Sequence, residues 1–250
     1  MPATDSLADR VAVIIGAAGG MGQAIVERLS TAGCRLALID LEPEALDRMV
    51  RNLSLGDSAI VIPADITDRT QIARAVQAVS ARFGGVDILI NAAGTNTKQR
   101  TLDDLSPEQW ERVIDINLSG VFHCTQAFLP LLKQQRGIVV TIASTAALRA
   151  TPGGGTAYCA SKRALISLNE SINAEQGKYG VRACVICPGE VDTPLIEKRP
   201  VLPSAERRAA MLKPDDIADT VHFIVTRPPH VTISDLVIWP SAQISGTYTV

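Results

Sequence analysis

The sequence has no excess of basic residues and no long apolar run. Its 24 basic and 26 acidic residues give a net charge of −2, and like charges form no run within the 250 residues. Nucleic acids and anionic membranes are bound by clustered basic residues, so we expect neither as a partner. No apolar run reaches the ~18 residues that a membrane-spanning helix needs. The N-terminal MPATDSLADR is polar and acidic, whereas a signal peptide is basic and then apolar, so we expect a soluble, cytoplasmic protein.

Cysteine and histidine are too few and too scattered to indicate a disulfide framework or a metal site. The five cysteines are odd in number and dispersed, which favours reduced thiols. Cys184 and Cys187 have C-x-x-C spacing, but they lie in VRACVICPG, which indicates a strand, where residues three apart point to opposite faces. We therefore expect two buried thiols there. The three histidines have no ligand spacing, and we predict no metal.

Linkers, low-complexity segments and fixed-period repeats are absent as well. Proline, glycine and serine occur at single turns and never gather into a stretch that would separate two domains. A chain of this length is long enough to bury one large core. We therefore expect a single domain over residues 1–250.

What the sequence does contain is a regular alternation of short β-branched runs and amphipathic segments. The runs are apolar almost without interruption, as strands buried on both faces are. They cover residues 11–16, 35–40, 59–65, 86–94, 137–144, 181–189 and 235–240. Strict alternation predicts an α/β fold: one Rossmann-type doubly wound parallel sheet of about seven strands with helices on both faces. Ligands of such folds bind at the carboxyl ends of the strands, so we expect functional residues there.

Capping and breaking residues mark the helices between these runs. Gly33 and Gly84 follow two amphipathic segments as stop signals, and Pro43 begins another. Ser106 followed by Pro107 predicts a capped helix start. These signals agree with the alternation of strand and helix.

The first strand runs into GAAGGMG, which contains Gly16, Gly20 and Gly22 and opens a helix. Glycines at this spacing allow a tight turn and a close approach of backbone N–H groups to a pyrophosphate, although such turns also arise from packing alone. Asp40 closes the second strand, where a carboxylate accepts hydrogen bonds from both hydroxyls of the adenosine ribose and repels a 2′-phosphate. The next residue, Leu41, offers that phosphate no basic partner. We therefore predict NAD rather than NADP.

Two further strand ends carry acidic or small residues. Asp65 ends the third run, where it is suited either to bond the adenine amino group or to cap the following helix. Residues 91–94, NAAG, end the fourth run, and their small side chains leave room for a cofactor across the sheet.

The stretch TPGGGTAYCASK places Tyr158 and Lys162 four residues apart, directly after a glycine-rich loop. A helix that begins near Thr156 sets the phenol and the ammonium side by side on one face. A phenol has an ordinary pKa of ~10 and is a poor base at neutral pH. A neighbouring cation favours the phenolate, so the pair is suited to proton transfer.

Other blocks complete a pattern. Asn117 lies in IDINLSGVF, Ser144 ends the fifth run, and residues 187–194, CPGEVDTP, end the sixth with a rigid Pro-Gly turn. Together with the glycine loop, NAAG and the Tyr-Lys pair, these blocks resemble the classical short-chain dehydrogenase/reductase (SDR) family. The resemblance runs from about residue 9 to residue 194, with every block in the family's order.

The resemblance implies a mechanism and a set of catalytic residues. Tyr158 is expected to act as the general acid/base, and Lys162 to favour its phenolate and to hold the nicotinamide ribose. Ser144 is expected to polarise the substrate oxygen, and Asn117 to bind a water in a proton relay behind the lysine. The implied function is an NAD-dependent oxidoreductase that interconverts a secondary alcohol and a ketone by hydride transfer.

The resemblance also implies which residues bind the cofactor. Backbone groups at Val191 are expected to bond the nicotinamide carboxamide, and Thr193 to contact the carboxamide or a phosphate. The complete expected set is Gly16, Gly20, Met21, Gly22, Asp40, Asp65, Ile66, Asn91, Ala92, Gly94, Tyr158, Lys162, Pro188, Val191 and Thr193.

The sequence departs from the family at three places. Ile15 stands where the family commonly has a threonine, and Ala92 replaces a common second asparagine. Ser144 lies 14 residues before Tyr158 instead of the usual 13, so the register leaves Thr145 as an alternative for the polarising role. We prefer Ser144, because a longer loop easily absorbs one residue.

The substrate is expected above Tyr158, against the loop TNTKQR, the loop LRATPGGGT and the segment 190–212, which indicates a substrate lid. These loops carry the cations Lys98, Arg100, Arg149, Lys198 and Arg199. One hypothesis is that a cation here binds an anionic substrate; the alternative, solvated loop charges, is favoured by the sequence alone.

Two functions from different classes remain possible at this point. The first is the NAD-dependent dehydrogenase or reductase, and the second is a non-catalytic NAD(H)-binding sensor or interaction protein on the same fold. The presence of the complete proton-transfer set favours the first. Helices like those that carry Asn117 and Tyr158 form subunit contacts in the family, so a homo-oligomer, a dimer or tetramer, is implied.

Overall fold

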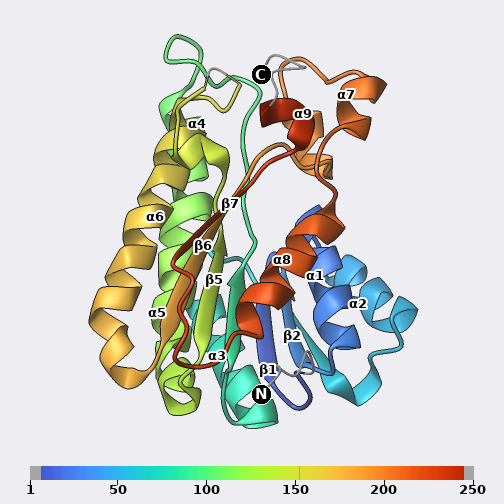
Figure 1. The fold of residues 1–250 in the computed structure, drawn as a ribbon, viewed down its shortest axis with the longest axis vertical. Helices are drawn as coiled ribbons and strands as arrows, with labels where there is room; N and C mark the ends of the chain where they lie inside the picture. Colours follow the sequence, from blue (N-terminus) through green and yellow to red (C-terminus); the bar gives the residue numbers. More distant parts are fainter. Residues whose placement is uncertain (1–6, 152, 245–250) are drawn as a thin grey trace.

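The computed structural model describes residues 7–151 and 153–244, and its core is one parallel sheet of seven strands in the order β3-β2-β1-β4-β5-β6-β7 (Figure 1). The strands are β1 Val11–Ile15, β2 Arg35–Asp40, β3 Ala59–Pro63, β4 Ile88–Asn91, β5 Ile138–Ile142, β6 Arg182–Pro188 and β7 Asp235–Ile238. The strand order reverses between β1 and β4, which is where ligands of doubly wound sheets bind. The expected α/β fold is confirmed.

Helices connect successive strands and cover both faces of the sheet (Figure 1). They are α1 Gly20–Thr31, α2 Pro43–Asn52, α3 Arg69–Phe83, α4 Pro107–Ile114, α5 Gly120–Gln135, α6 Thr156–Gln176, α7 Ala205–Ala209, α8 Pro214–Val225 and α9 Ser241–Ile244. Helices α7 and α9 lie beyond the carboxyl ends of the strands, at the upper end of Figure 1. The active end of the sheet is therefore covered by segments late in the sequence.

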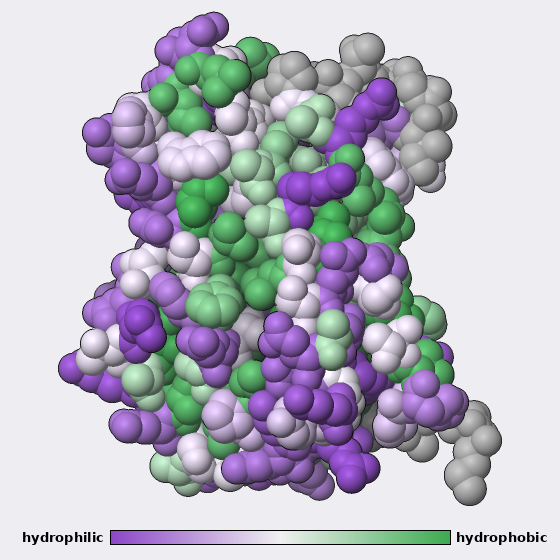
Figure 2. All heavy atoms as spheres, turned by 90° about the vertical axis from the view of Figure 1, so that its left-hand side faces the viewer, coloured by the Kyte–Doolittle hydropathy of each residue, from purple (hydrophilic) through white to green (hydrophobic). Residues whose placement is uncertain are grey.

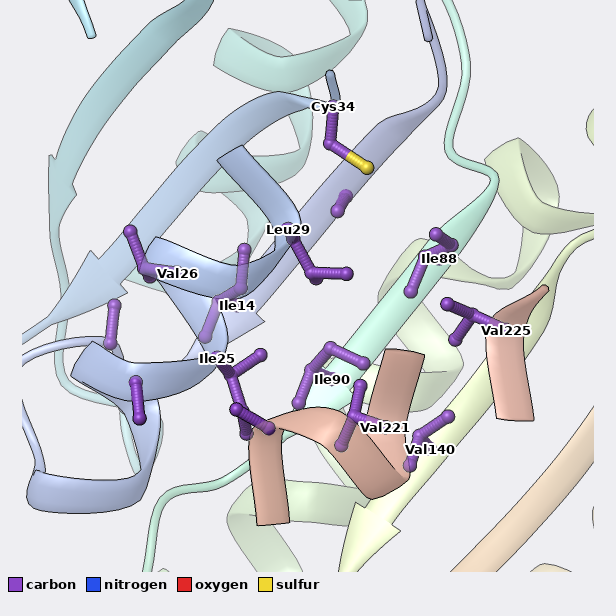
Figure 3. Packing of buried hydrophobic residues seen from close by; sticks show 14 of the residues in the cluster. Ile14, Ile25, Val26, Leu29, Cys34, Ile88, Ile90, Val140, Val221 and Val225 are labelled. Atoms are coloured by element: carbon purple, nitrogen blue, oxygen red, sulfur yellow. The ribbon is translucent and has the colours of Figure 1, made fainter. Parts of the chain in front are cut away.

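The sheet is buried on both faces because its strands are apolar throughout. On one face, Ile14, Ile90 and Val140 pack against Ile25 of α1 and Val221 of α8 (Figure 3). On the other face, residues of the opposite parity pack against helices α3, α5 and α6. Alternate strand residues enter opposite clusters, as the pleat requires.

The capping signals lie where the sequence predicts them, with one correction. Gly84 ends α3 in the left-handed conformation, with φ of 81°. Ser106 and Gln109 form a capping box at the start of α4. The cap of α3, however, is Asp68, which accepts from Thr70 N, so the capping alternative for Asp65 is wrong.

Several strands are shorter than predicted. Strand β3 ends at Pro63 and β5 at Ile142, so Asp65 and Ser144 each lie two residues past a strand end. Of NAAG, only Asn91 belongs to β4. Asp65 and Ser144 still lie within two residues of a strand end, at the carboxyl edge of the sheet.

The cysteines are all free and buried. Cys184 packs in the cluster with Ile14, whereas Cys187 packs in a separate cluster with Val121. The prediction that these two thiols face opposite sides of a strand is confirmed.

Within the described range, no helix is both long and apolar enough to cross a membrane. The expectation drawn from the N-terminal stretch falls largely on residues 1–6, which lie outside that range.

The segment 190–212, expected as a lid, is closed at its base. Val191 and Leu212 form a parallel bridge, and Leu212 N donates to Glu190 O at 3.0 Å. Between them the chain forms a short 3-10 helix, Pro194–Lys198, and then α7. Leu195 and Ile196 of the first element and Arg207 of the second line the cavity of the candidate site.

Candidate functional site

Two positions of the glycine loop, Gly16 and Gly22, have no space for a side chain. Gly16 has φ of +82°, and a Cβ on it would lie 2.5 Å from Ala93 N. A Cβ on Gly22 would lie 2.0 Å from Gly16 O. On Gly20, a Cβ would lie 3.1 Å from the side chain of Thr193. The loop, NAAG and the turn after β6 therefore meet, although the sequence separates them by more than 70 residues, and they leave the backbone open to a ligand.

Asp40 is fixed beside this loop. Its Oδ2 accepts from Ala18 N at 2.9 Å, and its Oδ1 accepts from Leu41 N at 2.7 Å. Each carboxylate oxygen accepts more than one hydrogen bond, so both retain capacity for a ligand hydroxyl. The carboxylate is thus oriented in advance, and the exposed residue beside it, Leu41, is apolar.

The other residues expected near the adenine and across the sheet differ in what they offer. Asp65 Oδ1 accepts from Thr67 N and Thr67 Oγ1, at 2.8 and 2.7 Å, and so forms a local turn. Ile66 is buried, and a Cβ on Gly120 would lie 2.8 Å from it. Ile66 therefore braces helix α5 as part of the core.

Asn91 points its side chain into the protein rather than toward the glycine loop. Its Nδ2 donates to Thr125 Oγ1 at 3.2 Å and to Thr141 Oγ1 at 3.4 Å. Its Oδ1 has no partner among the residues that the structure describes. A contact from Asn91 to a cofactor would therefore come from its backbone.

Tyr158 and Lys162 lie in the first turns of α6, on one face. The helix begins at Thr156, and the Lys162 Nζ lies 5.7 Å from the centroid of the Tyr158 ring. Lys162 Nζ also donates to Ile142 O at 2.9 Å, at the end of β5. Burial lowers the pKa of Lys162 from 10.5 to about 8. The expected juxtaposition of phenol and ammonium is confirmed.

Ser144 and Thr145 both line the cavity beside Tyr158. Burial raises the pKa of Tyr158, and the Ser144 side chain opposes this rise. Ser144 also caps the short 3-10 helix Thr145–Ala147 by accepting from Ala146 N at 3.2 Å. The preference for Ser144 over Thr145 in the polarising role stays a prediction.

Asn117 lies in a π-helical turn, Asp115–Ser119, between α4 and α5. Its Oδ1 accepts from Thr95 N at 2.7 Å, and its Nδ2 donates to Thr95 O at 3.0 Å and to Ser161 Oγ at 3.2 Å. Both amide hydrogens are used, so the side chain ties the loop after β4 to helix α6. π-turns of this kind are common at functional sites, because they turn backbone groups out of the helical ladder.

A cavity of about 720 Å³ joins the catalytic and nicotinamide-side residues. Ser144 and Tyr158 line it together with Met21, Pro188 and Val191. Its volume falls within the range of small-molecule sites. Residues that the sequence places in four separate blocks therefore share one wall.

Two contributors to this cavity, Trp239 and Gln243, were missed from the sequence, and a third, Glu190, was expected only as part of the segment 190–212. Trp239 and Gln243 line it from the C-terminal end, and Gln243 Oε1 accepts from Glu190 N at 3.0 Å. Glu190 itself is buried and binds Arg199 at 2.6 Å and Arg207 at 2.9 Å. An acidic residue directly after Pro-Gly was the available signal for Glu190; for Trp239 and Gln243 the sequence offers none, because their placement depends on the path of the chain after β7.

Comparisons with known proteins agree with this geometry. The family model for short chain dehydrogenases matches residues 10–200. An uncharacterized oxidoreductase of Staphylococcus epidermidis is 34% identical over 233 residues, 93% of this chain and 97% of that protein. A 3-ketoacyl-(acyl-carrier-protein) reductase from Brucella melitensis, complexed with NADH, superposes with a TM-score of 0.85 at 28% identity, covering 93% of this chain and 98% of that chain. An alcohol dehydrogenase from the archaeon Thermococcus sibiricus, complexed with 5-hydroxy-NADP, gives 0.84 at 30% identity, covering 94% and 97%. This chain belongs to the classical short-chain dehydrogenase/reductase family of oxidoreductases.

Proposed function

We propose that the protein is an NAD-dependent dehydrogenase or reductase that interconverts a secondary alcohol and a ketone. The observation that carries this proposal is that Ser144 and Tyr158 line one cavity, with Lys162 against the tyrosine ring. A protein that only binds a cofactor has no need of such an arrangement. Membership of the oxidoreductase family supports the same conclusion.

Ser144, Tyr158 and Lys162 have separate roles in the proposed proton transfer. In the oxidation direction, the Ser144 hydroxyl donates a hydrogen bond to the substrate oxygen, and Tyr158 Oη takes the hydroxyl proton. Nicotinamide, when bound, supplies the hydride acceptor. The buried Lys162 ammonium stabilises the phenolate, and the tie from Asn117 to Thr95 and Ser161 holds the helix that carries both residues in place.

The glycine cradle and Asp40 support NAD as the cofactor. The cradle excludes every Cβ at Gly16 and Gly22, which fits a pyrophosphate approached by backbone N–H groups. Asp40 is held by two backbone N–H groups with lone pairs to spare, which suits the two ribose hydroxyls of NAD and repels the 2′-phosphate of NADP. The solved relatives carry ligands of both kinds, so the preference rests on Asp40.

The proposal includes a homo-oligomer formed through the face that carries α4, α5 and α6. A hydrophobic patch lies on this face (Figure 2), and Phe122 of α5 remains 42% exposed. Exposed apolar patches on enzymes of this size commonly mark subunit contacts. A monomeric mass in light scattering would contradict this part of the proposal.

One experiment tests the function. The purified protein is incubated with NAD or NADP and a panel of secondary alcohols, polyols and hydroxy acids, and with NADH or NADPH and the matching ketones, while absorbance of the reduced cofactor is followed. We expect turnover with NAD and a kcat/KM at least ~10-fold lower with NADP, an energy difference of about 1.4 kcal/mol. A preference for NADP would overturn the reading of Asp40, and silence in both directions with intact NADH binding would favour the non-catalytic sensor.

A further inference from the structure

Arg100 is a buried cation in the wall of the substrate cavity. Its side chain belongs to a residue only 5% exposed, and it lines the same cavity as Ser144 and Tyr158. The guanidinium donates to three backbone carbonyls: Nε to Thr97 O at 2.9 Å, Nη1 to Gly153 O at 2.7 Å and Nη2 to Lys198 O. It thereby joins all three loops that surround the cavity.

The surrounding backbone is built closely around this side chain. Gly155, at the start of α6, has φ of +81°, and a Cβ there would lie 2.4 Å from Arg100 Cβ. Thr156 N donates to Arg100 O at 2.9 Å. The position of the guanidinium is therefore set by the same turn that begins the helix of Tyr158.

Among the residues that the structure describes, no carboxylate pairs with Arg100. Arg199 and Arg207 share the buried Glu190, at 2.6 and 2.9 Å. Within the described part of the chain, the partners of Arg100 are neutral carbonyls. Four arginines and a single glutamate are among the described residues that line the cavity, the remaining arginine being Arg149. The cavity is therefore electropositive. Arg100 is its buried arginine, whereas Arg149 is exposed and Arg199 and Arg207 share Glu190.

Arg100 also retains donors for a ligand. A guanidinium has five N–H groups, and the three carbonyls use one on each nitrogen. One N–H remains on each terminal nitrogen. Arg100, Ser144 and Tyr158 line one cavity. An anion bound to Arg100 would therefore share that cavity with the reacting carbon.

We propose that the substrate is a small hydroxy acid or oxo acid and that Arg100 binds its carboxylate while Tyr158 and Ser144 hold its alcohol or ketone oxygen. This proposal rests on the proposed function and names its substrate class. The reaction balances without a further reactant: the hydroxy acid loses a hydride to NAD and a proton to Tyr158, and yields the oxo acid. A substrate carboxylate supplies the counter-charge that a buried guanidinium otherwise lacks, with charge-assisted hydrogen bonds.

The test measures binding without turnover. The protein is saturated with NADH, and the dissociation constants of 2-hydroxybutyrate, 3-hydroxybutyrate and 4-hydroxypentanoate are measured by calorimetry beside those of their methyl esters. A reduced cofactor and a hydroxy acid cannot react, so the complex is stable. We expect at least one acid to bind ~10-fold or more tightly than its ester, as a charge-assisted pair implies. Equal binding of acid and ester, or no binding by any acid, overturns the proposal.

Variants then assign the preference to Arg100. In Arg100→Gln the ratio between acid and ester is expected to fall to about one, whereas Lys98→Gln, an exposed position in the same loop and outside the cavity lining, keeps the wild-type ratio. Arg100→Lys retains the charge and is expected to keep part of the preference, so it replaces Arg100→Gln if that variant does not fold. An unchanged ratio in the folded variant overturns the assignment.

Two other outcomes are distinguishable. If Arg100 acts only on Tyr158, Arg100→Gln shifts the pH profile of kcat to higher pH and leaves the ratio between acid and ester unchanged, which overturns this proposal. If neutral alcohols turn over with NAD while acids neither bind nor react, the proposed function stands and the hydroxy acid is wrong. If acids bind preferentially but no substrate turns over, the carboxylate site stands and the proposed function fails.

Discussion

The nucleotide half and the substrate half of the site are built in different ways. In the nucleotide half, backbone geometry dominates. Gly16 and Gly22 leave no space for a Cβ, and Asp40 accepts hydrogen bonds from the backbone N–H groups of Ala18, in the glycine loop, and of Leu41. In the substrate half, long charged side chains dominate, and Arg100 reaches a carbonyl 98 residues away. The first half suits a nucleotide cofactor, which is shared across the family. The second half consists of loops joined by side-chain hydrogen bonds, and it suits a substrate, which differs between family members.

This difference indicates that the side chains of the loops determine the substrate specificity. A cradle of backbone N–H groups suits a pyrophosphate in any member of the family. The side chain of Arg100 joins the loops 95–100, 148–155 and 190–212, because its guanidinium donates to Gly153 O and to Lys198 O. A change of one such side chain alters the substrate without disturbing the cofactor, which is how function varies on a constant scaffold.

The largest expected effect separates chemistry from cofactor binding. Tyr158→Phe removes the proton acceptor, and we expect kcat/KM to fall by roughly 10³-fold, while the dissociation constant of NADH, measured by fluorescence titration, changes by no more than a few-fold. Tyr179→Phe is the matched control, because Tyr179 is 46% exposed and far from the cavity lining. Residual activity within tenfold of wild type would rule out Tyr158 as the general base.

The next effect concerns the register of the polarising hydroxyl. Ser144→Ala removes the hydroxyl that we expect to polarise the substrate oxygen, and we expect kcat to fall by roughly 10²-fold, comparable to the loss of an oxyanion donor. Thr145→Ala should cost no more than a few-fold. Steady-state kinetics of the two variants side by side decide the question, and a greater loss in Thr145→Ala would reverse our assignment.

A substitution in the cradle should damage the nucleotide half and the fold together. In Gly22→Ala the new Cβ overlaps Gly16 O, and we expect a loss of about 2–3 kcal/mol of stability, a fall in Tm of roughly 5–10 °C, by analogy with overpacked cores. NADH binding should weaken at least ~10-fold. Gly177→Ala is the control, since nothing lies within 4 Å of its Cβ position. An unchanged melting curve for Gly22→Ala would show that the loop yields easily.

The smallest effect is expected for the loss of the Glu190 carboxylate, which should change the substrate half of the site and leave the nucleotide half unchanged. Burial raises the pKa of Glu190, but the hydrogen bonds from Arg207 and Arg199 outweigh it, and the pKa lies below the ordinary 4.5. Because the folded-state pKa is depressed, the stabilisation is complete above pH 4.5 and is lost as the pH falls through the folded-state value. We expect Glu190→Gln to cost about 1–2 kcal/mol at pH 7, less than a fully buried pair because both arginines are partly exposed.

The control for Glu190→Gln is Glu197→Gln, whose carboxylate is 57% exposed and contacts Arg208 at 3.5 Å. Chemical denaturation of both variants at pH 7 and at successively lower pH values measures the effect. The substrate KM should rise several-fold while NADH binding is unchanged. A difference between wild type and Glu190→Gln that does not shrink as the pH falls would contradict the role of the ionised carboxylate.

Much of the fold followed from the sequence because its signals are local. Continuous apolar runs predicted all seven strands, and Ser106, Pro107 and Gly84 predicted helix boundaries that the structure confirms. The pairing of Tyr158 with Lys162 followed from helical periodicity alone. The alternative prediction that Asp65 caps α3 was wrong. Asp65 and Asp68 are equally good caps by residue type, and only the structure shows that Asp65 forms the turn at Thr67 while Asp68 caps the helix.

Residue types at short spacing were enough to predict the layered α/β fold, the glycine cradle and the family of the chain. The burial of Glu190 between two arginines and the burial of Arg100 in the cavity wall could not be predicted in this way, because they depend on contacts between distant segments. In the sequence Arg100 is one of five cations in the loops, and the sequence alone favoured exposure of these charges to solvent. Its burial depends on carbonyls from three loops that meet only when the sheet brings the ends of β4, β5 and β6 together.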